Sequence, residues 1–166
     1  MVRHRVYIGI GSNQGDKFDN CQSALQRIAA IPETRLMTSS SFFDSEPWGS
    51  SQQWFINGAA AVDTNLEARC LLDSCQAIEW DMGRRRTARR WEDRVIDLDL
   101  LFFDDLVIDD PRLKIPHPEL HKRKFVLVPM CEIAPDVMHP VLKMSIVQLL
   151  ARVQDGKRVS PMCESE

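Results

Sequence analysis

The sequence predicts an α+β fold in which an antiparallel sheet carries helices on one face. Short runs of apolar and β-branched residues alternate with segments whose apolar residues recur at helical spacing. The first six of these segments follow the order strand, helix, strand, strand, helix, strand. That order is typical of a ferredoxin-like βαββαβ core, here followed by extra C-terminal strands and helices.

The first half of the chain supplies three of the strands and one helix. Val6–Ile10 predicts a strand, and the glycine-rich stretch that follows lacks the spacing of a phosphate-binding loop, so it predicts a turn. Asp16 then caps a helix that ends before Pro32. Leu36–Asp44 and Phe55–Val62 predict two strands. The loop between them is too long for a tight hairpin and contains two tryptophans, which is typical of a binding loop.

The second half begins with a helix over Glu67–Met82, which Gly83 ends. A strand starts at Val95, and a short strand passes through Val107–Ile108. The proline-rich segment Arg112–Pro118 is expected to be extended. A last helix carries its own capping signals.

Ser145 is the expected N-cap of that last helix, and Gln148 completes a capping box. Arg123 and Phe125 open a segment that runs to Pro135, and we assign no element to it. We expect the polar tail after Gln154 to be frayed.

The composition is that of one globular domain over residues 1–166. The net charge of −3 argues against a general nucleic-acid or anionic-membrane binder, which would be basic. No apolar run approaches the roughly 18 residues of a membrane helix. The five cysteines form no C-x-x-C pair, which favours reduced thiols and a cytoplasmic protein.

Two acids stand at alternate positions of the strand that starts at Val95. Because strand side chains alternate between faces, Asp97 and Asp99 share one face at about 6–7 Å between their Cα atoms. The other face is apolar and carries Ile96, Leu98, Leu100 and Phe102. This spacing suits Mg²⁺ shared with phosphate oxygens, although the acids could also simply face solvent.

An arginine-rich segment precedes this strand. Six of the fifteen arginines fall within eleven residues: Arg84, Arg85, Arg86, Arg89, Arg90 and Arg94. Guanidinium groups pair bidentately with phosphate, and the adjacent acid pair could hold a metal ion, so we favour a polyphosphate substrate. A solvated charge run or a nucleic-acid-binding loop are the alternatives.

Two further polar residues stand in unusual settings. Asn57 is an amide within an apolar run, where it could be satisfied by backbone or could read the edge of a heterocycle. His117 lies between two prolines, so its position is rigid enough for a fixed phosphate donor.

Short motifs follow one another in a specific order along nearly the whole chain. They are Gly11-Ser12-Asn13, Ser40-Ser41 through Pro47-x-Gly49, Phe55-x-Asn57, Gly83-Arg84-x-Arg86, Arg90-Trp91-x-x-Arg94-x-x-Asp97-Leu98-Asp99, Pro116-His117-Pro118, Arg123-x-Phe125-Val126-Leu127 and Glu132-Ile133-Ala134-Pro135. In this order they resemble the 6-hydroxymethyl-7,8-dihydropterin pyrophosphokinase family of folate biosynthesis.

The resemblance implies an Mg-dependent transfer of pyrophosphate from ATP to the hydroxymethyl group of the pterin, giving AMP and the pterin diphosphate. Asp97 and Asp99 would hold two Mg²⁺ ions, and Arg84 and Arg94 would stabilise the transferred group. The residues that would contact ATP are Gln76, Arg86, Trp91, Arg112, His117 and Arg123. The residues that would bind the pterin are Ser45, Pro47, Trp48, Phe55, Asn57 and Phe125, with the two phenylalanines enclosing the ring.

The sequence departs from the family pattern at Glu92 and Asp93, which add two negative charges where the family usually has small residues. A paralogue with another acceptor, or a metabolite binder without turnover, is therefore an alternative. An RNA-binding ferredoxin-like module is less favoured, because the aromatic signature on central strands is missing. We expect a monomer that acts on small molecules, without nucleic-acid or membrane partners.

Overall fold

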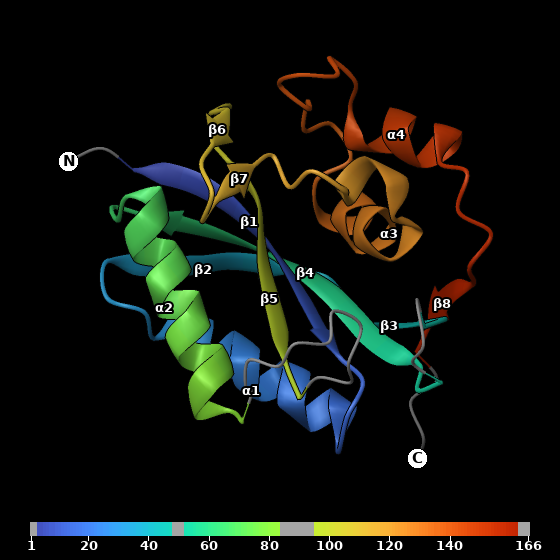
Figure 1. Cartoon of the computed structure of the whole chain (residues 1–166), viewed down its shortest axis with the longest axis horizontal. Helices are drawn as coiled ribbons and strands as arrows, with labels where there is room; N and C mark the ends of the chain where they lie inside the picture. The colour runs from blue at the N-terminus through green and yellow to red at the C-terminus, as the bar shows by residue number, and fades with distance from the viewer. Residues whose placement is uncertain (1–2, 48–51, 84–94, 163–166) are drawn as a thin grey trace.

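The computed structural model describes residues 3–47, 52–83 and 95–162 (Figure 1). The elements, in chain order, are β1 (His4–Ser12), α1 (Lys17–Ala29), β2 (Thr34–Ser39), β3 (Phe43–Ser45), β4 (Phe55–Thr64), α2 (Ala68–Asp81), β5 (Asp97–Phe103), β6 (Ile108–Asp109), β7 (Lys114–Ile115), the 3₁₀ helix η1 (Leu120–Lys122), α3 (Lys124–Ile133), α4 (Ile146–Arg152) and β8 (Val159–Pro161). Within these ranges there is no helix long and apolar enough to cross a membrane.

The main sheet has six strands, and its order is β5-β1-β4-β3-β8, with β2 also paired to β4. All of its pairings are antiparallel. The central strand β1 lies between β4 and β5, and α1 and α2 make the two connections of the βαββαβ core. The ferredoxin-like prediction is therefore confirmed.

The strand predicted over Leu36–Asp44 is divided into β2 and β3. Ser40 causes the break, because its hydroxyl accepts the backbone N–H of Ala59 at 2.8 Å in place of a backbone carbonyl. Phe42 then turns into the core, where its ring lies over Gly58; a Cβ at that glycine would come within 2.7 Å of the ring. The break between β2 and β3 therefore depends on the Ser40 hydrogen bond and on the packing of Phe42 against Gly58. The alternation of residues along a strand gives no information about either contact.

Helices cover both faces of the sheet: the core helices α1 and α2 lie on one face, as predicted, and the extra C-terminal helices α3 and α4 lie on the other. One core joins α1 and α2 to the sheet through residues such as Leu25, Ile28 and Leu71. A second core joins α3 and α4 to the opposite face through residues such as Leu127 and Ile146. Figure 1 shows α3 and α4 well apart from α1 and α2. The segment without an assigned element is α3, whose helical pattern is obscured by an internal proline.

A β-bulge in β5 changes which of its apolar residues face each layer of helices. The register between β1 and β5 shifts so that Ile8 pairs with Leu100 and Tyr7 pairs with Phe102, which leaves Leu101 as the extra residue. Leu101 and Phe102 both enter the core beneath α3 and α4, whereas Leu100 enters the core beneath α1 and α2. The prediction that Phe102 shares a face with Leu100 is therefore wrong. Before the bulge the alternation holds.

The C-terminal residues confirm one prediction and correct another. Ser145 and Gln148 form the expected capping box of α4, with the Gln148 N–H donating to Ser145 Oγ at 3.3 Å and Ser145 N donating to Gln148 Oε1 at 2.9 Å. The tail, however, is not frayed throughout. Val159–Pro161 forms β8, which pairs with β3 at the edge of the sheet (Figure 1).

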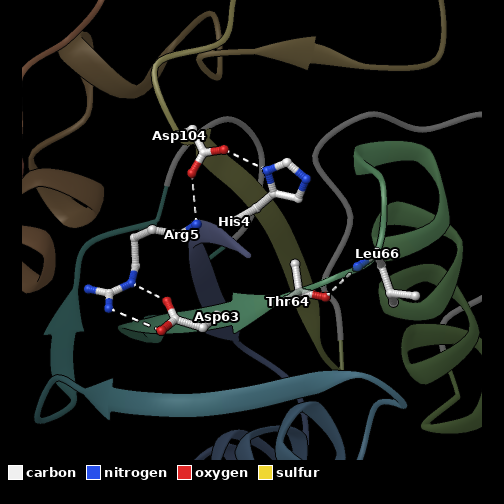
Figure 2. Close-up of polar contacts among 6 residues, drawn as sticks. All are labelled: His4, Arg5, Asp63, Thr64, Leu66 and Asp104. Carbon is white, nitrogen blue, oxygen red and sulfur yellow. Dashed lines mark hydrogen bonds and ion pairs between the residues drawn. The ribbon is translucent and has the colours of Figure 1, made fainter. Parts of the chain in front are cut away.

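At the N-terminal end of β1, a polar network links the strand to its neighbours (Figure 2). His4 Nδ1 lies 2.6 Å from Asp104 Oδ2, and the Arg5 backbone N–H donates to Asp104 Oδ1 at 2.8 Å. The Arg5 guanidinium donates to Asp63 Oδ1 at 2.5 Å, and this bond lowers the pKa of the Asp63 carboxyl. The network joins β1 to β4 and to the end of β5.

Candidate functional site

The acid pair lies at the start of β5, next to the central strand. Asp97 pairs with Gly11, and Asp99 pairs with Gly9. Both carboxylates are half-buried and project from the face that α3 and α4 cover farther along, opposite Leu98. The predicted shared face of the two acids is therefore confirmed.

The same row of the sheet continues onto β4, where Asn57 pairs with Gly11. Residues that are directly opposite in neighbouring strands share a face, so Asn57 and Asp97 flank Gly11 on one surface. A Cβ at Gly11 would come within 2.7 Å of Asn57 Nδ2. The glycine therefore gives the amide room to lie over the central strand.

This role of Gly11 was missed, because the sequence predicted a turn there. The strand continues to Ser12 because β4 and β5 pair with it on both sides. Glycine next to the Gly-Ser-Asn motif was the signal in the sequence. Its meaning depends on which residues lie across the sheet, and spacing along the chain does not give that information.

Asn57 is buried, and its hydrogen-bond partner is a side chain. Ser45 on β3 is also buried, and its hydroxyl donates to Asn57 Oδ1. This bond fixes the amide so that its Nδ2 group points over Gly11. Pro47 follows two residues after Ser45 and is half-buried. The structure thus brings Ser45 and Asn57 together as the sequence predicted.

Phe55 and Phe125, the two phenylalanines predicted to enclose the ring and here called the aromatic walls, lie on elements that pack together. Phe55 begins β4 beside Asn57, and Phe125 is in the first turn of α3, the helix that covers this face of the sheet. Both rings are half-buried. The Arg123 guanidinium lies 5.7 Å from the centre of the Phe125 ring, within the range of a cation–π contact. One helix start therefore carries an aromatic face and a cation side by side.

His117 is held rigidly close to these residues. Its backbone N–H donates to the Leu101 carbonyl at 3.0 Å, and its Nδ1 accepts the Glu119 backbone N–H at 3.1 Å. Burial, and after it the charge of Arg123, lower the pKa of His117 to about 4, while the carboxylates of Asp97 and Glu119 oppose the shift. Since Nδ1 is an acceptor, the neutral ring carries its proton on Nε2. It can donate one hydrogen bond.

Arg112 and Gln76 lie together on the flank formed by α2. The Arg112 guanidinium donates to Asp73 Oδ1 at 2.7 Å, and Gln76 lies one turn after Asp73 on the same helix. Arg112 is exposed, whereas Gln76 is half-buried. An anionic ligand at this flank would compete with Asp73 for the guanidinium.

A third carboxylate near the acid pair was not among the predicted residues. Glu79 on α2 is buried, and its Oε2 accepts the backbone N–H of Leu98 at 2.8 Å, between Asp97 and Asp99. A buried acid on the inner side of an amphipathic helix is a signal that the sequence did carry. It anchors the start of β5 from the opposite face.

Five predicted site residues lie outside the described residues: Trp48, Arg84, Arg86, Trp91 and Arg94. The same holds for Glu92 and Asp93. The arginine-rich segment therefore remains a prediction from the sequence.

The donor set fits magnesium. Asp97 and Asp99 offer hard carboxylate oxygens from one face, and Gly9 and Gly11 beside them present no side chains. Within the described ranges no group of three or more His, Cys, Asp or Glu side chains is gathered for a metal. Magnesium needs only one or two protein carboxylates when substrate phosphates and water complete its shell. Asp97 and Asp99, with no side chain from Gly9 or Gly11 beside them, match that requirement.

The chain matches the model of the family described as 7,8-dihydro-6-hydroxymethylpterin-pyrophosphokinase (HPPK) over residues 7–135. A 2-amino-4-hydroxy-6-hydroxymethyldihydropteridine pyrophosphokinase of Pseudomonas aeruginosa is 45% identical over 137 residues, which cover 82% of this chain and 84% of that protein. The protein of the same name from Haemophilus influenzae is 39% identical, and the match covers 93% of this chain and 96% of its own.

Solved structures agree on the fold. A Plasmodium falciparum HPPK-DHPS with pterin and p-hydroxybenzoate aligns with a TM-score of 0.73 over 91% of this chain at 15% identity. The alignment spans 43% of that longer chain. The chain belongs to the 7,8-dihydro-6-hydroxymethylpterin-pyrophosphokinase family and is a pyrophosphokinase of folate biosynthesis.

Proposed function

We propose that this chain carries out the reaction at the surface that joins Asp97, Gly11 and Asn57. Pyrophosphate passes from ATP to the hydroxymethyl oxygen of the pterin, which leaves AMP and the pterin diphosphate. The observation that carries this proposal is the row across three strands, with the acid pair on one side of the glycine and the fixed amide on the other. This row places the acid pair, which could bind phosphate through a metal ion, beside the amide, which could bind a polar heterocycle.

On the phosphate side, Asp97 and Asp99 hold two Mg²⁺ ions. Bound there, Mg²⁺ would supply positive charge that offsets the charge of the phosphate oxygens. Arg84 and Arg94 stabilise the transferred group. The residues that contact ATP are Gln76, Arg86, Trp91, Arg112, His117 and Arg123. The neutral ring of His117 supports this role, because its Nε2 proton can be donated to a phosphate oxygen without a charge to desolvate.

On the pterin side, Phe55 and Phe125 enclose the flat ring, and Asn57 reads its polar edge. Ser45 fixes Asn57, while Pro47 and Trp48 complete the proposed binding residues. A heterocycle binds well to aromatic faces with a few placed hydrogen bonds, because an unpaired polar edge is costly to bury. The bond between Ser45 and Asn57 supports this reading, since it orients the amide before any ligand arrives.

We also propose that residues 1–166 act as a single domain and as a monomer in the cytoplasm. Its partners are then small-molecule substrates, with no nucleic acid or membrane among them. The net charge of −3 supports the proposal that nucleic acids and anionic membranes are not partners, because general binders of polyanions are basic.

The test is to replace either acid with asparagine. Asp97→Asn and Asp99→Asn are nearly isosteric but remove a charged metal ligand, so AMP production should fall by about 10²-fold or more while the far-UV circular dichroism is unchanged. Asp105→Asn is the matched control, because Asp105 is an exposed acid that follows the same strand. Activity like that of the wild type in either site variant would contradict the assignment.

A further inference from the structure

We infer that residues 155–161, here called the C-terminal strap, position the pterin-binding residues from behind. The strap was expected to be part of a frayed tail, yet it contacts Trp54 and Lys124, the residues that precede Phe55 and Phe125. Asp155 and Arg158 act as positioning residues, and β8 carries the strand pairing. The inference rests on the proposed function of Ser45, Asn57 and Phe125.

The strap holds the strand that carries Ser45. β8 pairs with β3 so that Val159 lies opposite Ser45 and Ser160 lies opposite Asp44. Ser45 in turn donates to Asn57 Oδ1. The strap is therefore linked to the Asn57 amide, which is proposed to bind the pterin, through the pairing of β8 with β3 and the hydrogen bond from Ser45.

Arg158 holds both stems of the connection between β3 and β4. Its backbone N–H donates to Glu46 Oε1 at 2.8 Å, and the Glu46 N–H donates to the Arg158 carbonyl at 3.0 Å. Its guanidinium lies 5.5 Å from the centre of the Trp54 ring, and Lys17 Nζ donates to the Trp54 carbonyl at 3.0 Å. Glu46 follows Ser45, and Trp54 precedes Phe55, so both flanks of the proposed pterin residues are held.

Asp155 holds the other wall. Its Oδ2 accepts the backbone N–H of Lys124 at 3.0 Å, and its Oδ1 accepts the N–H of Lys157 at 2.9 Å. Lys124 begins α3, and the preceding Arg123 makes no capping bond with its own side chain. Asp155 therefore supplies one of the acceptors that the start of this helix needs. Phe125 is the next residue.

The two attachments together set the separation of the aromatic walls. A flat ring gains most from two faces held at a fixed distance, because otherwise binding must also order the side chains. Exposed ion pairs alone contribute little, and the Arg158 side chain is 78% exposed. The strand pairing and the helix cap are therefore the strong parts of the strap.

The pairing geometry provides a selective way to release the strap. The bonds from Glu46 N to the Arg158 carbonyl and from Met162 N to the Phe42 carbonyl fall on alternate pairs. The pair Asp44 and Ser160 lies between them, so Ser160 is at a hydrogen-bonded position. A proline there removes a ladder donor, whereas alanine retains it.

The experiment compares Ser160→Pro with Ser160→Ala. Pterin affinity is measured by calorimetry with Mg²⁺ and a non-hydrolysable ATP analogue present, and KM and kcat are measured for both substrates. We expect Ser160→Pro to raise the pterin Kd and KM about tenfold, because binding must then order the released residues. kcat and the affinity for the ATP analogue should stay within about twofold of wild type, as should every parameter of Ser160→Ala.

Asp155→Ala tests the α3 attachment in the same assays, and we expect a rise of about threefold to tenfold in the pterin Kd. It also keeps the inference testable if Ser160→Pro fails to fold. Asn57→Ala serves as the reference for the site. If Asn57→Ala weakens pterin binding while Ser160→Pro and Asp155→Ala do not, the strap is not a positioning element. An equal loss for pterin and ATP analogue would also contradict the inference, since it indicates general destabilisation. Unchanged pterin binding in Asn57→Ala would instead overturn the proposed pterin residues themselves.

Discussion

At the scale of single residues, Gly11 links the two halves of the site. It lies between Asp97 on β5 and Asn57 on β4, and it has no Cβ to push the amide away. A Cβ at Gly9, its neighbour on the same face, would first meet the Leu101 side chain, at 3.5 Å. Two glycines on one strand therefore have different roles, and the difference lies in their neighbours.

This contrast gives a matched pair of variants. Gly11→Ala should weaken pterin binding about tenfold, because the new methyl group must displace the Asn57 amide. Gly9→Ala should change pterin affinity by less than about twofold, since its methyl group meets Leu101 at an ordinary contact distance. Calorimetry with the pterin measures both. Equal affinities for the two variants would show that Asn57 is not displaced or does not contact the ligand.

His117 predicts a pH dependence of stability. Its pKa is lowered by burial from 6.5 to about 4 in the folded chain, so between these values the unfolded chain binds a proton that the folded chain does not. Stability should therefore fall as pH drops from about 6.5 to about 4. For this residue the loss is at most about 3 kcal/mol.

The measurement is urea unfolding of wild type and His117→Gln, without nucleotide, at pH 7.0, 5.5 and 4.5 (roughly the window above). The variant should lose less stability than wild type over this range. The pKa of His139 is also lowered by burial, but His139 is present in both proteins, so its contribution cancels in the difference. Parallel pH profiles would mean that His117 is protonated equally in both states.

At the scale of elements, the local signals predicted where most helices and strands begin. Asp16 caps α1 through the Asp19 N–H at 3.2 Å, and the capping box at Ser145 begins α4, as their sequence motifs indicate. Caps are local, because their donors and acceptors lie within one turn. The breaks, bulges and edges were not predicted. The break at Ser40, the bulge at Leu101 and the pairing of β8 all depend on a partner strand that is distant in the sequence.

The bulge has a consequence for the whole site. With regular pairing and no bulge, alternation along β5 would leave Phe102 on the face of Leu100, under α1 and α2. The bulge instead turns Phe102 to the opposite face beside Leu101 and turns Phe103 to the face of Leu100. Leu127 and Met130 of α3 cover Leu101 and Phe102. That cover places the start of α3, with Phe125, over the sheet that carries Asn57.

At the scale of the whole molecule, β1 connects a polar network at its N-terminal end to the proposed active site near its C-terminal end. The network of His4, Arg5, Asp63 and Asp104 lies at the beginning of the strand (Figure 2), and Gly11 lies near its end. Asp104 accepts from two partners, one of them a backbone N–H. The two ends share one strand but no side-chain contact among those described above.

This separation predicts a variant that changes stability without changing catalysis. Asp104→Gly should lower the free energy of unfolding by about 1–3 kcal/mol, because His4 and the Arg5 N–H lose their acceptor. Asp104 has a φ of 50°, which glycine adopts without strain, so the loss reports the contacts. KM values for both substrates should be unchanged.

Asp105→Gly is the control, because it adds the same backbone freedom at the next exposed residue. Urea unfolding and steady-state kinetics give both quantities. An increase in KM for Asp104→Gly with no loss of stability would show that the far network acts on the site.

The sequence by itself determined the fold class, the family and the chemical types in the site. Asp97, Asp99 and Asn57 stand out because acids or amides within strand patterns violate the expected burial, and this signal is local. Ser45 and Phe125 were predicted from the order of motifs, since their own surroundings in the sequence are ordinary.

Tertiary structure alone decided how these residues are assembled. The second helical layer, the face of Phe102, the open position at Gly11 and the attachment of the strap at Asp155 are all contacts between segments far apart in the chain. Periodicity reports that a residue is apolar or polar, and it does not report its partner. Partners are selected by sheet register and by close packing, in which one inserted residue moves every following side chain to the other face.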